Sequence, residues 1–269
     1  MRPPAAILDL CCGEGGISMG YYNGGFARVV GVDLNDDCRD RYKRPRPRPL
    51  KRYPFPSIEM DALQALEELL RGGYLITDIP GGGHGEVTLA DFAAIHASPP
   101  CQLFSRMTKV NGRRRDGTPH VDLITPMRPL LEETGLPYVI ENVPEAAAAG
   151  VMRADLMLCG SMFDPPLDVQ RHRVFEANWP IRETDWPCRH GLWGKGRFKQ
   201  RDYRKNRGDY SMRVVPVYGG TRFAGDAAIR RRAMEIDWMT LAGLNEAIPP
   251  RYGEFIGAQL LQHISERAA

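Results

Sequence analysis

Short apolar runs alternate with helical patterns through the first half of the chain, and this alternation limits the possible folds more than any other feature. Strands are expected over residues 5–10, 28–33, 93–97 and 137–143, and helices over 17–23 and 62–70. Strand, helix and strand repeated in this order are typical of a parallel sheet with helices on both faces. The sequence therefore predicts an α/β fold with a doubly wound, mostly parallel sheet.

The alternation stops near residue 176, where a segment rich in Gly, Arg and aromatic residues begins. Residues 176–236 contain no long periodic run, and regular structure returns at 237–269 with a helical pattern over 252–261. We predict a main domain at 1–175, a small irregular lobe at 176–236 and a C-terminal segment at 237–269 that rejoins the main domain. The glycine-rich stretch 81–85, which includes His84, is expected to be a flexible loop.

Composition indicates an ordinary soluble globular protein, because 43% of the 269 residues are apolar and 26% are charged. No apolar segment approaches the roughly 20 residues needed to span a bilayer, and the first residues lack a signal-peptide pattern. We therefore expect a cytoplasmic protein. The sequence does not fix an oligomeric state, and a monomer is favoured.

Six cysteines in a reducing compartment raise the question of metal binding or reactivity. They show no repeated C-x-x-C pairing, and although Cys188 and His190 could supply two ligands, no second pair follows at finger-like spacing. We therefore expect no metal site. Cys101 directly follows the expected strand 93–97 and the rigid pair Pro99-Pro100, at the end of a strand where open α/β sheets place their chemistry. It is the candidate nucleophile, and an inert thiol in a turn is the alternative.

Three segments concentrate positive charge. Residues 39–52 carry eight Lys or Arg against one acidic residue, and residues 182–213 carry ten against four, with aromatic residues among them. A third segment, 106–115, follows Cys101. A polyanion-binding face explains such clustering near a reactive centre, and three solvated loops are the alternative.

A glycine-rich turn and two carboxylates predict a nucleoside-bearing cofactor. Gly13, Gly15 and Gly16 stand between the first strand and the first helix, where backbone N–H groups can meet a cofactor. Asp33 ends the second strand and can accept hydrogen bonds from ribose hydroxyls, while Asp61 can accept one from an adenine amino group. Helix capping is the alternative for each carboxylate.

Four segments in order, residues 9–16, 99–102, 141–143 and 171–173, resemble motifs of the cytosine-5 DNA methyltransferases. Residues 247–257 are similar to the family's last motif, so the resemblance covers nearly the whole chain except the lobe. Small phage-encoded members are the most similar. The resemblance implies a Rossmann-like class I methyltransferase fold, S-adenosylmethionine as cofactor, double-stranded DNA as partner and a short target-recognition role for the lobe.

The resemblance also implies a mechanism. Cys101 would add to carbon 6 of a cytosine flipped out of the duplex, which turns carbon 5 into a nucleophile for the methyl group. Glu141 would hydrogen-bond ring nitrogen 3 and the exocyclic amine. Arg171 and Arg173 would hold the base carbonyl and a nearby phosphate, and could depress the pKa of the thiol.

Further residues are assigned by their positions in the motifs. The implied cofactor-binding residues are Asp9, Cys11, Cys12, Gly13, Gly15, Gly16, Asp33, Leu34, Asp61, Ala62, Pro99, Glu246 and Ala247. The implied substrate-binding residues are Pro100, Gln102, Ser105, Asn142 and Val143. The chain departs from the family at three places: Cys11 replaces a phenylalanine, Glu246 replaces an asparagine, and Gln170 directly precedes Arg171 where one residue usually intervenes.

Two other functions are compatible with the sequence. The same chemistry on RNA or on a free cytidine nucleotide would suit the small lobe, although the basic segments disfavour the free nucleotide. A catalytically silent nucleic-acid-binding protein would have no use for Cys101 and Glu141 together. We therefore expect an enzyme that methylates cytosine in DNA.

Overall fold

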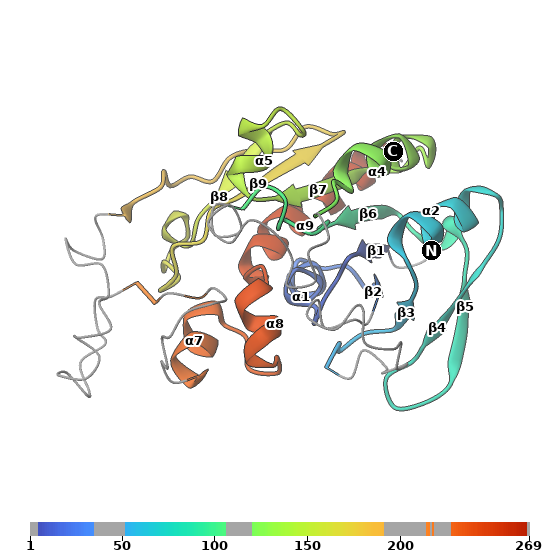
Figure 1. Ribbon diagram of the computed structural model, residues 1–269, viewed down its shortest axis with the longest axis horizontal. Helices are drawn as coiled ribbons and strands as arrows, with labels where there is room; N and C mark the ends of the chain where they lie inside the picture. Colours follow the sequence, from blue (N-terminus) through green and yellow to red (C-terminus); the bar gives the residue numbers. More distant parts are fainter. Residues whose placement is uncertain are drawn as a thin grey trace.

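The computed structural model describes residues 5–34, 52–105, 120–190, 214–215, 217 and 227–267. Within them the chain forms one nine-stranded sheet flanked by helices (Figure 1). The strands are β1 (Ala6–Leu10), β2 (Arg28–Asp33), β3 (Ser57–Glu59), β4 (Leu75–Asp78), β5 (His84–Val87), β6 (Ala94–Ala97), β7 (Tyr138–Asn142), β8 (Leu156–Leu158) and β9 (Arg173–Ala177). The helices are α1 (Gly16–Asn23), α2 (Ala62–Leu70), α4 (Ile124–Glu133), α5 (Pro144–Ala148), α7 (Ala227–Met234), α8 (Leu241–Glu246) and α9 (Pro250–Arg267), with short 3-10 turns η1 (Leu89–Asp91) and η2 (Gly160–Met162).

The strand order confirms the predicted fold class. The sheet runs β5-β4-β3-β2-β1-β6-β7-β9-β8, and the five strands from β3 to β7 in this order are parallel. The hairpin β4–β5 extends one edge and the antiparallel strands β9 and β8 extend the other. This is a Rossmann-like, doubly wound and mostly parallel sheet, the fold that the resemblance to class I methyltransferases implies. From β1 the chain adds β2 and β3 on one side of the sheet, and it then adds β6 and β7 on the other side. The boundary between β1 and β6 is therefore the topological switch point, where such sheets bind ligands.

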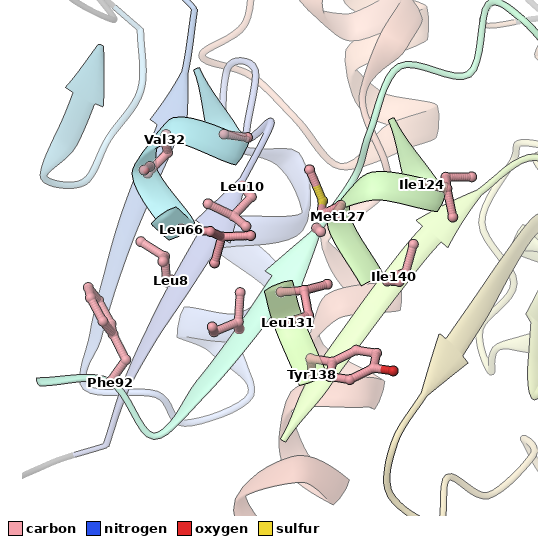
Figure 2. Packing of buried hydrophobic residues seen from close by; sticks show 14 of the residues in the cluster. Leu8, Leu10, Val32, Leu66, Phe92, Ile124, Met127, Leu131, Tyr138 and Ile140 are labelled. Atoms are coloured by element: carbon pink, nitrogen blue, oxygen red, sulfur yellow. The ribbon is translucent and has the colours of Figure 1, made fainter. Parts of the chain in front are cut away.

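Two hydrophobic cores form on opposite faces of the sheet. Leu8 and Leu10 of β1 pack with α2 and α4 (Figure 2), while Ile7 packs with α1, α8 and α9. This alternation is the ordinary two-residue period of a strand. Asp9 shares the face of Ile7, so the pleat alone directs its carboxyl toward α1.

The packing of α1 on α9 depends on small residues. A Cβ atom placed on Gly20 would lie 2.1 Å from the backbone oxygen of Pro250 and 2.7 Å from Cα of Gly253. Gly16 likewise approaches the backbone of Ile248. The first helix can therefore lie directly against the C-terminal segment.

Three local expectations differ from the structure. Only Gly81, Gly82 and Gly83 form a turn, all with positive φ, whereas His84 begins β5 and pairs with Asp78 at 2.9 Å. The C-terminal helix is longer than its apolar pattern, because polar residues continue it beyond 261. Strand β9 runs to Ala177, so the expected boundary at 175/176 falls inside a strand.

Part of the expected lobe packs into the second core. Trp179, Val215, Val217, Met234 and Ile236 are all buried there. The basic segment 106–115 and most of 39–52 and 182–213 lie outside the described residues. Among the helices that the structure describes, none combines the length and the apolar character needed to cross a bilayer.

Candidate catalytic site

The loop after β6 presents Cys101 at the switch point of the sheet. The backbone oxygen of Cys101 accepts hydrogen bonds from the N–H groups of Phe104 and Ser105, at 3.0 and 2.9 Å. The chain therefore turns back immediately after the cysteine, and buried Phe104 anchors the turn in the first core. The thiol itself is partly buried, with half-buried Pro100, Gln102 and Ser105 around it.

Glu141 stands at the equivalent end of β7, the next strand in the sheet. Its side chain is buried, hydrogen-bonds with the Ser98 hydroxyl and lies beside Arg173, whose Nε is 2.8 Å from Oε1. The guanidinium N–H is not aligned on that oxygen, so Oε1 makes an ion pair but no hydrogen bond among the described residues. Burial raises the pKa of the Glu141 carboxyl, while Arg173 and Arg171 oppose the rise.

Asn142 joins the loop of Cys101 to the end of β7. Its side-chain nitrogen donates to the backbone oxygen of Pro99 at 2.9 Å, and its side-chain oxygen accepts from the N–H of Val143, also at 2.9 Å. The residue is fully buried. Asn142 therefore fixes the loop that carries Cys101 relative to the strand that carries Glu141, which is a positioning role where substrate contact was expected.

The four expected catalytic residues lie within electrostatic reach of one another. Burial is the main influence on Cys101 and raises the pKa of its thiol; Arg173 and then Arg171 lower it, and Glu141 and Glu246 raise it. The expectation that the arginines would depress the pKa of the thiol is correct in the sign of their influence. The net shift is nevertheless upward, because burial outweighs them.

Arg171 has a structural role that the sequence does not predict. Its terminal nitrogens donate to the backbone oxygens of Val217 and Asn245, at 2.7 and 2.9 Å. Its own backbone oxygen accepts from the Tyr252 hydroxyl at 2.6 Å. Arg171 thus ties the start of β9 to α8, α9 and the segment around Val217. Arg173, whose Nε faces Glu141, is the arginine placed against the carboxyl.

A series of buried hydrogen bonds through Tyr21, His96 and Ser98 ends at Glu141. The Tyr21 hydroxyl lies 2.8 Å from Nδ1 of His96, and Nε2 of His96 lies 2.8 Å from the Ser98 hydroxyl that meets Glu141. Burial lowers the pKa of His96 to about 3, so the ring is neutral near pH 7. The sequence gives no signal for this series of hydrogen bonds, since His96 stands alone in an apolar run.

The glycine turn has the backbone that a cofactor loop needs. Cys11, Gly13 and Gly15 all have positive φ, and the N–H of Gly13 donates to Asp33 at 2.7 Å. A Cβ atom on Gly15 would lie 2.9 Å from the Tyr53 ring, so only glycine fits there. Buried Cys12 continues the turn, and half-buried Cys11 packs against the first core. Asp33 therefore holds the turn at the end of β2.

Asp9 lies beneath this turn, fully buried. Its carboxyl accepts a short hydrogen bond from Ser18, which in turn accepts one from the Tyr53 hydroxyl at 3.0 Å. The other carboxyl oxygen, Oδ1, has no hydrogen-bond partner among the described residues. Burial raises the pKa of Asp9 from an ordinary value of 3.8 to about 8. Asp9 is therefore largely a neutral acid near pH 7, hydrogen-bonded to Ser18 of α1.

The remaining expected cofactor residues differ in burial and in their contacts. Asp61 caps α2, accepting from the N–H groups of Leu63 and Gln64 at 2.9 and 3.2 Å, so the capping alternative describes its observed contacts. Ala62 follows it and is buried, whereas Leu34 is 40% exposed. Pro99 is engaged through its carbonyl with Asn142.

The C-terminal segment meets the turn through Glu14. The Thr240 backbone N–H and hydroxyl donate to the Glu14 carboxylate at 2.6 and 2.5 Å, and the Trp238 ring N–H donates to the Glu14 backbone oxygen at 2.9 Å. A Cβ atom on Gly16 would lie 3.2 Å from Cβ of Ala247. Glu246 and Ala247 therefore lie at the glycine turn, as the resemblance implies. Val143 borders the other side of the site, where it and Arg173 line a hollow of about 390 Å³.

A Cys/His cluster contradicts the expectation of no metal site. Cys188 and His190 have a second Cys/His pair, Cys159 and His172, and the four ligand atoms all lie within 4.8 Å of one another. This pair precedes Cys188 in the chain, at a spacing unlike that of a zinc finger. Only the folding of three loops onto one another brings the four side chains together.

Comparisons with known proteins give distant structural similarities. Neither a scan of family models nor a search of curated proteins finds a match. The methyltransferase EhMeth of Entamoeba histolytica aligns over 100% of both chains with 12% identity and a TM-score of 0.48. The Dnmt2 methyltransferase of S. pombe covers 97% of this chain and 99% of its own with 14% identity and a TM-score of 0.45.

A third similar structure is a putative DNA modification methyltransferase encoded within an E. coli prophage. It covers 64% of this chain and 45% of its own, with 19% identity and a TM-score of 0.35. All three alignments score below 0.5. The fold class of this chain therefore rests on its own strand order and connections.

Proposed function

We propose that the chain transfers a methyl group from S-adenosylmethionine to carbon 5 of cytosine in DNA, through a covalent bond between Cys101 and carbon 6. The observation that carries the proposal is the arrangement at the switch point. A partly buried thiol in the loop after β6 and a buried carboxyl in β7 lie within electrostatic reach of each other. Arg173, whose Nε is 2.8 Å from the carboxyl, acts on the pKa of both groups.

The residues around the glycine turn fit the cofactor. The turn leads into the N-terminus of α1, where backbone N–H groups and the helix dipole favour a carboxylate. Asp33, at the end of β2, can accept hydrogen bonds from ribose hydroxyls while it holds Gly13. When bound, S-adenosylmethionine supplies an electrophilic methyl group. The positions of β1 and β6 in the sheet would set that group beside the loop of Cys101.

The chain's own residues would activate the base. The Cys101 thiolate adds to carbon 6, forming a carbon–sulfur bond, while the Glu141 carboxyl hydrogen-bonds ring nitrogen 3 and neutralises the charge that develops there. The raised pKa of Glu141 favours the protonated carboxyl that such a contact requires. Carbon 5 would then bond to the methyl carbon as the methyl–sulfur bond of S-adenosylmethionine breaks and S-adenosylhomocysteine leaves. Loss of the carbon 5 proton to a base would re-form the C5–C6 double bond and expel the thiolate. Arg173 would orient Glu141 and approach the base carbonyl.

Duplex DNA is the proposed substrate, and the charge distribution supports a nucleic acid over a free nucleotide. Cytosine must leave the stack to reach Cys101, at a cost of a few kcal/mol. The basic segments 39–52, 106–115 and 182–213 would bind phosphates and offset that cost. RNA and a free cytidine nucleotide are the alternatives, and a nucleotide would draw little benefit from three basic segments.

Methyl transfer to three substrates tests the proposal. Labelled S-adenosylmethionine would be offered with duplex DNA, tRNA or dCMP to the wild type and to Cys101→Ala. We expect label at carbon 5 of cytosine in duplex DNA, and loss of transfer in Cys101→Ala with DNA affinity retained. Preferred labelling of tRNA or dCMP would overturn the DNA assignment, and wild-type turnover by Cys101→Ala would overturn the mechanism.

A further inference from the structure

Two cysteines and two histidines meet near the turn that carries Arg171 and Arg173. Cys159 precedes η2 and is fully buried, while His172 stands between the two arginines at the start of β9. Cys188 and His190 end the described segment that leads to residue 191. Their four ligand atoms lie within 4.8 Å of one another.

The distances approach those of a tetrahedral metal site. Sγ of Cys159 lies 3.4 Å from Nε2 of His190, and Sγ of Cys188 lies 3.4 Å from Nε2 of His172. With zinc bonds of about 2.3 Å to sulfur and about 2.05 Å to nitrogen, the corresponding edge of a tetrahedron is about 3.6 Å. Of these three distances, that between Sγ of Cys188 and Nε2 of His190, 2.8 Å, must lengthen, by about 0.8 Å.

Neighbouring polar groups are placed as a second coordination shell would be. The buried Ser161 hydroxyl lies 3.6 Å from Sγ of Cys159 and 3.5 Å from Sγ of Cys188, and it also accepts from the Arg189 N–H at 2.9 Å. The Gln170 side-chain nitrogen lies 2.9 Å from Nδ1 and 3.2 Å from Nε2 of His190. With the amide turned over, its oxygen would accept from the Nδ1–H of a histidine that binds metal through Nε2. Such contacts to metal-bound sulfur and to the outer nitrogen of a histidine orient the ligands of metal sites.

We propose that Cys159, His172, Cys188 and His190 bind one zinc ion as a structural site. Two thiolates and two imidazoles in a tetrahedral arrangement favour zinc, and four protein ligands leave no open position for catalysis. The ion would cross-link the residue before η2, the turn that carries Arg171 and Arg173, and the segment of Cys188 and His190. It would thereby fix Arg173 beside Glu141. The proposal does not depend on the reaction proposed above, because metal content is measured on the purified protein alone.

Metal analysis of the full chain tests the site. The protein would be produced without a histidine tag, in medium supplemented with zinc, and analysed by inductively coupled plasma mass spectrometry. We expect one zinc ion per chain in the wild type and its loss in Cys188→Ser and in His190→Asn. Cys101→Ser and His84→Asn are matched controls, since they remove a thiol and an imidazole outside the cluster, and both should keep the ion.

Cobalt substitution covers the case in which a ligand variant fails to fold. The wild type, stripped with a chelator and refilled with Co²⁺, should show a thiolate-to-cobalt charge-transfer band and the visible bands of tetrahedral cobalt. Gln170→Ala should keep the spectrum but weaken metal binding by about 10- to 100-fold. A folded wild type that carries no zinc, takes up no Co²⁺ and exposes reactive thiols at Cys159 and Cys188 would overturn the proposal. So would a zinc content unchanged in Cys188→Ser and His190→Asn.

Discussion

Replacing Asn142 separates the positioning of the site from the stability of the fold. In Asn142→Ala, the backbone oxygen of Pro99 and the N–H of Val143 lose their partners in a fully buried setting. Each orphaned group costs about 1–3 kcal/mol, so the free energy of unfolding should fall by about 2–6 kcal/mol. The loop of Cys101 would also lose its tie to β7, and a shift of about 1 Å typically slows the chemical step by about 100-fold.

The other end of β7 offers a matched control. Asn178 bridges two backbone groups in the same way, accepting from the N–H of Tyr138 at 2.7 Å and donating to the backbone oxygen of Leu136 at 3.0 Å. It is exposed. Asn178→Ala should therefore lose only two ordinary hydrogen bonds, about 0.5–1.5 kcal/mol each. It lies at the strand end opposite to Cys101 and should leave the rate of methyl transfer unchanged.

Urea unfolding and single-turnover methyl transfer would be measured on both variants, at a temperature where each is folded. Asn142→Asp keeps the acceptor for Val143 and loses the donor to Pro99, and it also places a buried carboxylate against the Pro99 carbonyl oxygen. We expect a slower chemical step in both Asn142 variants and a wild-type rate in Asn178→Ala. Equal rates in Asn142→Ala, Asn178→Ala and the wild type would refute the positioning role.

Three further predictions follow from the buried groups. The folded state raises the pKa of Asp9 from 3.8 to about 8 and so holds a proton that the unfolded chain releases. The unfolding free energy should therefore fall by on the order of 5 kcal/mol as pH rises from about 4 to about 8. Urea unfolding of Asp9→Asn over this range should lack the fall, and parallel pH profiles of the variant and the wild type would contradict the prediction. Gly20→Ala should lower the unfolding free energy by about 1–3 kcal/mol or more, since its Cβ would meet the Pro250 oxygen at 2.1 Å; an unchanged melting temperature by calorimetry would count against the close packing of α1 on α9. Arg173 is the main charge that lowers the pKa of Cys101. Arg173→Ala should therefore move the rising limb of the pH–rate profile to higher pH, and Arg173→Lys should move it less. An unchanged limb in both variants would show that the charge of Arg173 does not act on the thiol.

Local patterns explain why much of the fold is predictable. Strand β2 and helix α2 have the predicted bounds, because each has an apolar pattern of its own period and Asp61 marks the start of α2. The gathering of Cys101 and Glu141 follows from the parallel sheet, since the ends of neighbouring parallel strands share one edge. The hairpin β4–β5 was missed because His84–Val87 is a strand only through its pairing with β4.

The rest depends on contacts between residues far apart in the chain. His96, Asn142 and Arg171 owe their roles to partners that the sequence does not place near them. The Cys/His cluster is the extreme case, because its ligands come from three loops at irregular spacing. Long-range polar contacts of this kind leave no periodic trace in a sequence.

Trapping on 5-fluorocytosine tests the central claim most directly, because fluorine at carbon 5 cannot leave and the covalent bond to Cys101 persists. The protein would be incubated with a duplex containing 5-fluorodeoxycytidine, with and without S-adenosylmethionine, and analysed by mass spectrometry after digestion. The account predicts a methylated adduct on Cys101 that requires the cofactor and is absent in Cys101→Ala. Methyl transfer to ordinary cytosine without any such adduct, or an adduct on another residue, would contradict it.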